Sequence, residues 1–243
     1  MSGQTLRILH TNDLHGTLSD AVAARLAEFR ADADLYVDTG DAVKAGNLAI
    51  PVSPDPVWPR LADLRCTASV PGNREAHLYE YVMRLKLAGL AHPMLCANLR
   101  HVRGEPLFPS SAIVPIAGWR VGLMAAMVPM VTERTKTKAA ATLRWTAPID
   151  ALRSVAEELR PQVDVLIALT HIGLARDREL AATIPAIDII CGGHSHDVLQ
   201  EPELVGRTWI VQGGSHARYV GRYEWREGAL TGGLVPLRSA AAR

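Results

Sequence analysis

The sequence has few aromatic residues and almost no net charge. Its 243 residues include only two phenylalanines, and its basic residues outnumber the acidic ones by one. A net charge of +1 provides no broad basic field of the kind that neutralises nucleic-acid phosphates, so we expect no nucleic-acid partner. A small phosphorylated ligand needs only a local site and remains compatible with this charge balance.

Long apolar runs and paired cysteines are also missing. No stretch of about 18 uninterrupted apolar residues occurs, so we expect no membrane span. The first residues lead directly into a strand-like segment without the apolar stretch of a signal peptide. The three cysteines (Cys66, Cys96 and Cys191) are odd in number, lie in apolar runs and lack C-x-x-C spacing. This usage predicts reduced, buried thiols and a cytoplasmic location.

The pattern of apolar residues predicts an α/β protein. Hydrophobic residues make up 48% and charged residues 21%, which is typical of a globular chain. Short apolar runs alternate with helical patterns over one expected domain, residues 1–243. We expect strands at 6–11, 35–39, 67–70, 94–99, 112–116, 120–127, 163–169, 187–191, 208–212, 219–225 and 229–237. We expect helices after Ser19 and near 60–64, 75–90, 148–159 and 176–184, with a long loop at 129–146.

Five of the expected strands end in residues that can bind a cation. These segments read LRILHTNDLH, LYVDTGD, ASVPGN, VLIALTH and DIICGGHSH. In open α/β sheets ligands bind beyond the carboxyl ends of the strands, so these side chains should converge on one cleft. The candidate ligands are Asp13, His15, Asp41, Asn73, His171, His194 and His196. Imidazoles and carboxylates together fit two neighbouring divalent ions of manganese, iron or zinc.

Each candidate also has an ordinary alternative. A lone histidine can be a structural or surface residue, Asp41 a turn residue and Asn73 a left-handed turn residue. The pairs Asp13/His15 and His194/His196 have one residue between their members, so both side chains point inward only if the strand end bends. The glycine after His15, Gly16, permits such a bend. The occurrence of suitable residues at five strand ends together favours a metal site.

At these residues the sequence resembles the calcineurin-like metallophosphoesterase superfamily, and within it the 5′-nucleotidase family. The segments LRILHTNDLHGTL, DTGD, GN, TH and GGHSH stand in the family's order, and VQGGSHARYVGR is a further match. The resemblance implies a four-layer α/β/β/α sandwich with two mixed sheets and the metals at one edge. It implies that one metal is bound by Asp13, His15 and His196, the other by Asn73, His171 and His194, and that Asp41 bridges both.

The resemblance also implies an enzyme, a metal-dependent phosphoesterase of the 5′-nucleotidase type. Its two divalent cofactor ions, manganese, iron or zinc, would hold a hydroxide that attacks phosphorus in a small phosphorylated substrate such as a nucleotide. Nucleotidases usually carry a C-terminal domain whose aromatic residues stack on the base, and this chain ends after the catalytic region. We therefore expect loops 42–58 and 129–146, or a partner subunit, to shape the pocket. The oligomeric state is left open.

The third motif departs from the family pattern. Where the family has GNHE or GNHD, this sequence reads GNREAH, so Arg74 occupies the place of the catalytic histidine. Arginine cannot donate a proton, but it can bind phosphate oxygens, so Asn73 and Arg74 are expected to contact substrate. A superfamily branch with GNRD splits a pyrophosphate bond, which makes pyrophosphatase or phosphodiesterase activity an alternative. A weakly catalytic, metal-containing binding module is another, and Arg74 could instead form a structural ion pair with Glu75 or a nearby acid.

Two further histidines are candidates for the site. His77 falls where nucleotidases place an acidic residue, and it could supply the missing acid function or lie on a helix surface. His216, in the segment GGSHARY, could reach the cleft from its loop and contact substrate.

Overall fold

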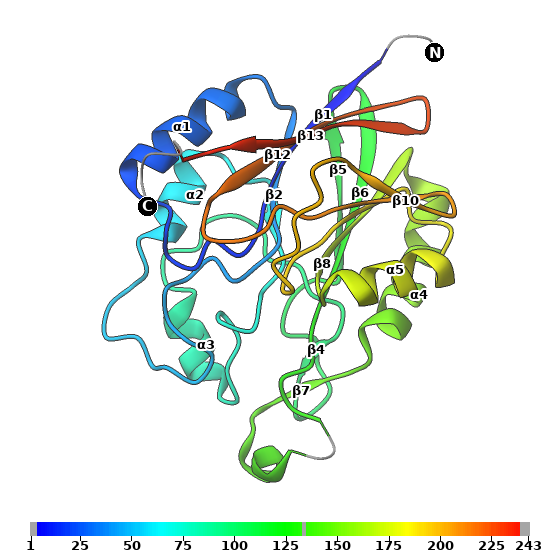
Figure 1. Ribbon diagram of the computed structural model, residues 1–243. Helices are drawn as coiled ribbons and strands as arrows, with labels where there is room; N and C mark the ends of the chain where they lie inside the picture. The colour runs from blue at the N-terminus through cyan, green and yellow to red at the C-terminus, as the bar shows by residue number, and fades with distance from the viewer. Residues whose placement is uncertain (1–3, 133–134, 239–243) are drawn as a thin grey trace.

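The computed structural model describes residues 4–132 and 135–238, which form two mixed β-sheets that face each other (Figure 1). The first sheet has the order β13-β12-β1-β2-β3. Its strands are β1 (Leu6–Thr11), β2 (Leu35–Asp38), β3 (Ala68–Ser69), β12 (Tyr219–Arg226) and β13 (Ala229–Pro236). β1, β2 and β3 are parallel, whereas β12 runs antiparallel to β1 and to β13.

The second sheet has the order β10-β11-β9-β8-β6-β5. Its strands are β5 (Ser111–Ile116), β6 (Trp119–Met127), β8 (Val165–His171), β9 (Ile189–Cys191), β10 (Glu203–Val205) and β11 (Thr208–Val211). Its four central strands are parallel, and an antiparallel strand closes each edge. A separate two-stranded sheet of β4 (Leu99–His101) and β7 (Leu143–Trp145) extends from the lower part of the molecule in Figure 1.

Helices cover the outer faces of both sheets. On one side of Figure 1 lie α1 (Asp20–Ala31) and α2 (Val57–Asp63), and on the other lie α4 (Pro148–Leu159) and α5 (Leu174–Thr183). Three buried apolar clusters fill the interfaces: one between the sheets around Ile167, one under α1 and α2 around Leu26, and one under α4 and α5 around Leu152. The predicted four-layer α/β/β/α sandwich with two mixed sheets is therefore confirmed.

Local sequence signals account for two of these elements. The hydroxyl of Ser19 accepts a hydrogen bond from the backbone N–H of Val22 and caps α1, whose buried face carries Val22, Leu26 and Phe29. The hairpin of β5 and β6 turns at Ala117 and Gly118, which both have positive φ as a tight two-residue turn requires.

The predicted helix over 75–90 is wrong in extent. α3 covers only Glu80–Lys86, because the buried Glu75 carboxylate binds backbone N–H groups and holds the preceding residues in turns. Leu85 on this helix is 46% exposed. Lys86 points inward instead, because its ammonium group donates to buried carbonyl oxygens.

Other element boundaries also differ. The predicted strand at 94–99 is reduced to a bridge from Met94 to Ser69, and β4 begins only at Leu99. α2 begins before the predicted position and contains Pro59 in its first turn, where a missing N–H costs little. The predicted loop at 129–146 contains β7 and the short 3-10 helix Lys136–Ala140, and its residues 133–134 lie outside the described part. A second 3-10 helix, Arg160–Gln162, follows α4. β10 was not predicted.

Among the residues that the structure describes, no helix is both long and apolar enough to cross a membrane.

Candidate metal centre

The carboxyl ends of five parallel strands meet at one edge of the sandwich. Asp13 and His15 follow β1, Asp41 follows β2 and Asn73 follows β3. His171 ends β8, and His194 and His196 follow β9. The structure brings all seven predicted ligand side chains together at this edge, which we call the metal-ligand cluster.

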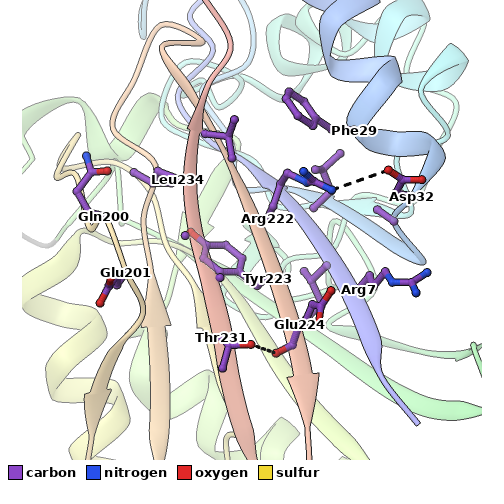
Figure 2. Close-up of a pocket in the computed structure, with 16 residues that line it drawn as sticks. Arg7, Phe29, Asp32, Gln200, Glu201, Arg222, Tyr223, Glu224, Thr231 and Leu234 are labelled. Atoms are coloured by element: carbon purple, nitrogen blue, oxygen red, sulfur yellow. Dashed lines mark hydrogen bonds and ion pairs between the residues drawn. The ribbon is translucent and has the colours of Figure 1, made fainter. Parts of the chain in front are cut away.

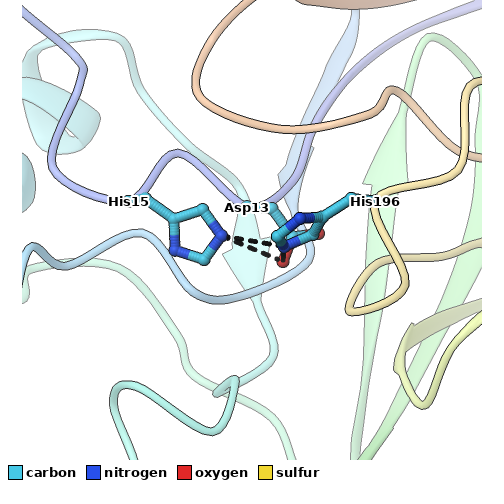
Figure 3. Close-up of side chains that lie close together, drawn as sticks. All are labelled: Asp13, His15 and His196. Atoms are coloured by element: carbon cyan, nitrogen blue, oxygen red, sulfur yellow. Dashed lines mark hydrogen bonds and ion pairs between the residues drawn. The ribbon is translucent and has the colours of Figure 1, made fainter. Parts of the chain in front are cut away.

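Three side chains form the first part of the cluster, and Figure 3 shows them converging from the loops after β1 and β9. Nε2 of His15 lies 2.9 Å from Nε2 of His196 and 3.6 Å from Oδ1 of Asp13. Oδ1 of Asp13 also lies 3.3 Å from Nε2 of His196. Two imidazole nitrogens and a carboxylate oxygen therefore point at one small volume, an arrangement suited to a divalent cation.

The second part of the cluster is built around Asn73. Its Oδ1 lies 2.8 Å from Nδ1 of His194 and 3.2 Å from Nε2 of His171. Nε2 of His171 is also 3.5 Å from Oδ1 of Asp41. The opposite ring nitrogen of His171 lies 2.7 Å from the carbonyl oxygen of Thr39, a bond that orients the ring and leaves Nε2 free to act as a ligand.

Asp41 lies between the two parts. While its Oδ1 faces His171, its Oδ2 lies 4.0 Å from Nδ1 of His15. Asp41, Asp13 and His171 can each place a ligand atom within 4.8 Å of the others. One carboxylate thus faces both groups of donors.

The ligand atoms of the cluster are arranged to bind a cation rather than to hydrogen-bond with one another. Oδ1 of Asp13 and Nδ1 of His15 are buried and have no hydrogen-bond partner among the described residues. A buried carboxylate oxygen without a partner is costly, and a positive ion at the cluster would satisfy it. The close approach of His15 Nε2 to His196 Nε2 also suits a shared electrophile, because two N–H groups would repel each other at 2.9 Å.

The charges of the cluster shift the pKa values of its members. Burial lowers the pKa of His171, but the hydrogen bond and charge of Asp41 outweigh burial and raise that pKa to about 9. Burial raises the pKa of Asp41, and the hydrogen bond from His171 reverses this and brings it to about 2. Burial, followed by the charge of Arg74, lowers the pKa of His15 to about 4. A site that binds a metal must release protons, and His15 is already poised as a neutral ligand.

The backbone at the cluster is strained. Among the described residues, ten non-glycine positions have positive φ, and five of these are metal-ligand candidates: Asp13, His15, Asp41, His194 and His196. Left-handed conformations of non-glycine residues persist where surrounding structure enforces them, often at functional sites. The predicted bend after β1 therefore involves Asp13 and His15 themselves as well as Gly16, with φ values of 51°, 51° and 69°.

Gly72 is required for a different reason. A Cβ at this position would lie 2.2 Å from Oδ1 of Asp41 and 2.4 Å from its backbone nitrogen. Only glycine lets the segment after β3 approach Asp41 this closely.

Glu75 and Lys86 support the cluster, and sequence reasoning missed both roles. The Glu75 carboxylate accepts the backbone N–H groups of Gly72, Asp41 and Val43 at 2.8, 2.8 and 3.0 Å. Nζ of Lys86 donates to the carbonyl oxygens of Arg74, Gly46, Asn47 and Ala76 at 2.6, 2.8, 3.0 and 3.3 Å. Burial raises the pKa of Glu75 and lowers that of Lys86 to about 8. A lysine flanked by leucines late in a short amphipathic helix was the available signal for Lys86.

A separate cavity of about 580 Å³ lies along β12 and β13 (Figure 2). Arg222, Asp32, Phe29 and Glu224 line it, and Arg222 lies 3.9 Å from Asp32 and over the Phe29 ring. None of the seven candidate ligands is among its lining residues.

Comparison with known proteins agrees with this geometry. Residues 6–198 match the family model for calcineurin-like phosphoesterases. The chain belongs to the calcineurin-like phosphoesterase family.

Two curated relatives of this family cover most of the chain. The uncharacterized metallophosphoesterase YunD of Bacillus subtilis is 26% identical over 91% of this chain and 50% of its own length. A 5′-nucleotidase of Vibrio cholerae is 28% identical over 93% of this chain and 50% of its own length. The chain thus spans about half the length of these relatives.

Solved structures share the calcineurin-like fold. A 5′-nucleotidase precursor from Thermus thermophilus superimposes with a TM-score of 0.79 at 22% identity, over 96% of this chain and 54% of that one. The sulfate thiohydrolase SoxB of the same organism gives a TM-score of 0.80 at 19% identity, over 98% and 57%. At this level of identity the likeness establishes the fold.

Arg74, expected from the sequence in the place of the family's histidine, lies beside the cluster. Its backbone N–H donates to Oδ1 of Asp41 at 2.7 Å, and its Nη1 donates to the carbonyl oxygen of Lys44 at 3.2 Å. The alternative of an ion pair with Glu75 is not realised among the described residues, because that carboxylate is occupied by backbone N–H groups. The guanidinium charge acts on His15 and His216 instead.

The other two predicted residues differ in their surroundings. His77 is buried in the irregular segment between the turn at 73–75 and α3, so the interpretation as a helix-surface residue is wrong. Its Nδ1 accepts the backbone N–H of Tyr79 at 3.0 Å. His216 is exposed, donates its backbone N–H to the Asp13 carbonyl oxygen at 2.7 Å, and places its ring centroid 4.7 Å from that of His15. His216 therefore borders the cluster.

Proposed function

We propose that this protein hydrolyses a phosphate ester of a small substrate, in the manner of a 5′-nucleotidase, with two divalent metal ions. The observation that carries the proposal is the position of Asp41, whose two carboxylate oxygens face His171 on one side and His15 on the other. The partnerless buried Oδ1 of Asp13 supports it further. Membership of the calcineurin-like phosphoesterase family supports the reaction class.

The ligand roles in the proposal follow the two parts of the cluster. Asp13, His15 and His196 hold one ion, Asn73, His171 and His194 hold the other, and Asp41 bridges them. Four imidazoles with two carboxylates and an amide oxygen favour manganese, iron or zinc, and we propose manganese as the first ion to test. When bound, the pair of ions supplies an activated water and neutralises charge on the attacking and leaving oxygens.

The chain's own residues complete the proposed site. The Arg74 guanidinium binds non-bridging phosphate oxygens. Because a guanidinium stays protonated, its positive charge is fixed during the reaction. The amide of Asn73 is held by Asn47, whose Oδ1 accepts from its Nδ2 at 2.9 Å, so its Oδ1 stays directed at the cluster. His216 contacts the substrate from the rim beside His15. His77 remains a candidate for the acid function, supported by its place in the third motif.

A second candidate reaction is cleavage of a pyrophosphate or phosphodiester bond in a nucleotide-type substrate. It is favoured by Arg74, because an arginine cannot protonate the alkoxide of a departing nucleoside. A leaving phosphate is a stable anion and needs no such proton. We further propose that residues 1–243 act as one catalytic domain, without nucleic acid. The cytoplasmic location is also a proposal, supported by three buried, free cysteines.

A substrate panel tests the proposal. The protein is loaded with manganese, zinc or iron and assayed on AMP, ADP, inorganic pyrophosphate and a bis-aryl phosphodiester. We expect metal-dependent release of phosphate or nucleotide, abolished in Asp41→Asn and retained in Asp63→Asn, an exposed control. Metal binding without turnover of any of these substrates would instead identify a metal-containing binding module.

A further inference from the structure

Four basic side chains surround the rim formed by His15 and His216. They come from the segments after β2 and β3, from the residue before β12 and from the segment after β13. Among the described residues none of them forms an ion pair, whereas eight other arginines each have a carboxylate partner. They are Lys44, Arg74, Arg218 and Arg238.

Arg218 is tied to the rim through Ser215. Its Nη2 donates to the Ser215 hydroxyl oxygen at 3.2 Å, and its Nε donates to the Ser215 carbonyl oxygen at 3.2 Å. The same hydroxyl lies 2.9 Å from Nδ1 of His216. Since His216 packs on the His15 ring, Ser215 holds the charge of Arg218 close to the metal-ligand cluster.

Arg238 approaches the rim from β13. Its Nη2 donates to the carbonyl oxygen of Thr17 at 3.2 Å, and its neighbour Leu237 donates its N–H to the Arg218 carbonyl oxygen at 3.0 Å. Nε of Arg238 is buried and has no hydrogen-bond partner among the described residues. An unsatisfied guanidinium donor calls for an acceptor, and the part of the chain that the structure describes does not provide one.

A hollow of about 710 Å³ opens beside Arg238. Gly16, Thr17, Arg25 and Arg238 are among the residues that line it, so it adjoins the loop that carries His15. On the other side of this loop Lys44 lies against Gly16, where an added Cβ would come within 2.4 Å of Lys44 Cβ. The carbonyl oxygen of Lys44 accepts from Arg74. Arg74 and Arg238 are thus linked to the loop that carries His15, the first through Lys44 and the second through Thr17.

The four side chains carry the same charge, and among the described residues no carboxylate pairs with any of them. Uncompensated positive charge at the mouth of a site attracts and orients anionic ligands.

We propose that Arg218, Arg238 and Lys44 form a subsite for a second phosphate group of the substrate, beside the phosphorus that is attacked. The substrate class is then a small molecule that carries a pyrophosphate, such as a nucleoside diphosphate, rather than a simple monophosphate. This inference rests on the proposed phosphoesterase function and specifies its substrate.

Binding of inorganic pyrophosphate and of inorganic phosphate tests the subsite without requiring turnover. Calorimetry on the manganese-loaded protein compares the wild type with Arg218→Gln and Arg238→Gln. The control is Arg226→Gln, which removes the same charge from an exposed position at the far end of β12. We expect each of the first two substitutions to weaken pyrophosphate binding at least about tenfold and to change phosphate binding less than about twofold. Arg226→Gln should change neither. The first two substitutions should likewise slow the hydrolysis of ADP and leave that of p-nitrophenyl phosphate nearly unchanged.

Equal affinity of the wild type for the two anions would overturn the inference, as would Arg218 and Arg238 variants that match Arg226→Gln. Should either variant melt at a lower temperature than the control, Lys44→Gln makes the same comparison with an exposed side chain. A wild type that binds pyrophosphate through these residues but hydrolyses nothing contradicts the proposed function and leaves the subsite standing. If ADP is hydrolysed and none of the three substitutions changes its hydrolysis, the subsite is contradicted and the proposed function stands.

Discussion

The backbone N–H of Arg74 donates to Oδ1 of Asp41 at 2.7 Å. The residue in the place of the family histidine is thus linked to the carboxylate that faces both halves of the cluster. Because this bond uses the main chain, the Arg74 side chain can be replaced without breaking it. A substitution at Arg74 can therefore test the role of the guanidinium without disturbing the metal-ligand cluster.

Arg74→Gln should lower kcat/KM by about ten- to a hundredfold while metal content stays unchanged, because a fixed cation on the phosphate oxygens is lost. Steady-state kinetics and elemental analysis of the same preparation check this. Arg103→Gln, an exposed arginine distant in sequence, serves as the control. Unchanged kinetics in Arg74→Gln would show that the guanidinium does not touch the substrate. A gain of AMP hydrolysis in Arg74→His would mark the chain as a decayed nucleotidase.

Gly72→Ala should displace Asp41, because the new Cβ would lie 2.2 Å from its Oδ1. A misplacement of about 1 Å at a reacting site costs about a hundredfold in rate, and we expect a loss of that order together with weaker metal binding. Gly46→Ala is the matched control, since nothing lies within 4 Å of the Cβ that it adds. Equal activities of the two alanine variants would argue against a role for the close approach at Gly72.

His10 should make stability fall with acidity. Burial lowers the pKa of His10 from 6.5 to about 3, so the folded protein keeps it neutral while the unfolded chain takes up a proton below about 6.5. The stability that the neutral ring contributes is present in full above pH 6.5 and is lost as the pH falls from there toward 3.

The variant His10→Gln lacks this titration and can still bond to Thr39, whose hydroxyl lies 2.8 Å from His10 Nε2. Between pH 6 and pH 4 the unfolding free energy of the wild type should fall by up to about 1.4 kcal/mol per pH unit more than that of the variant. Urea unfolding at several pH values measures the difference. Parallel pH profiles would mean that His10 is not held neutral by burial.

Much of the fold and the meeting of seven candidate side chains at one edge could be predicted because the relevant signals are local. A buried strand followed by a histidine or aspartate is visible in VLIALTH and DTGD without any knowledge of neighbours. The order of the layers followed from a resemblance that covers most of the chain. The bend that aims Asp13 and His15 inward could be anticipated from their spacing.

The supporting residues could not be predicted in the same way. The roles of Glu75 and Lys86 depend on backbone groups brought near by folding, such as the N–H of Val43 and the carbonyl oxygen of Gly46. Those long-range bonds also explain why the helix predicted to begin at Glu75 begins only at Glu80. The cations at 218 and 238 likewise become a group only when β12 and β13 approach the loop after β1.

The most direct test of the metal centre is the number of divalent ions that the purified protein holds. Elemental analysis after loading with manganese, zinc or iron should find two ions per chain in the wild type and in Asp63→Asn. Asp41→Asn should lose one or both, because its carboxylate is the group that faces both halves of the cluster. A wild type that takes up no divalent ion, or an Asp41→Asn variant that keeps two, would contradict the account.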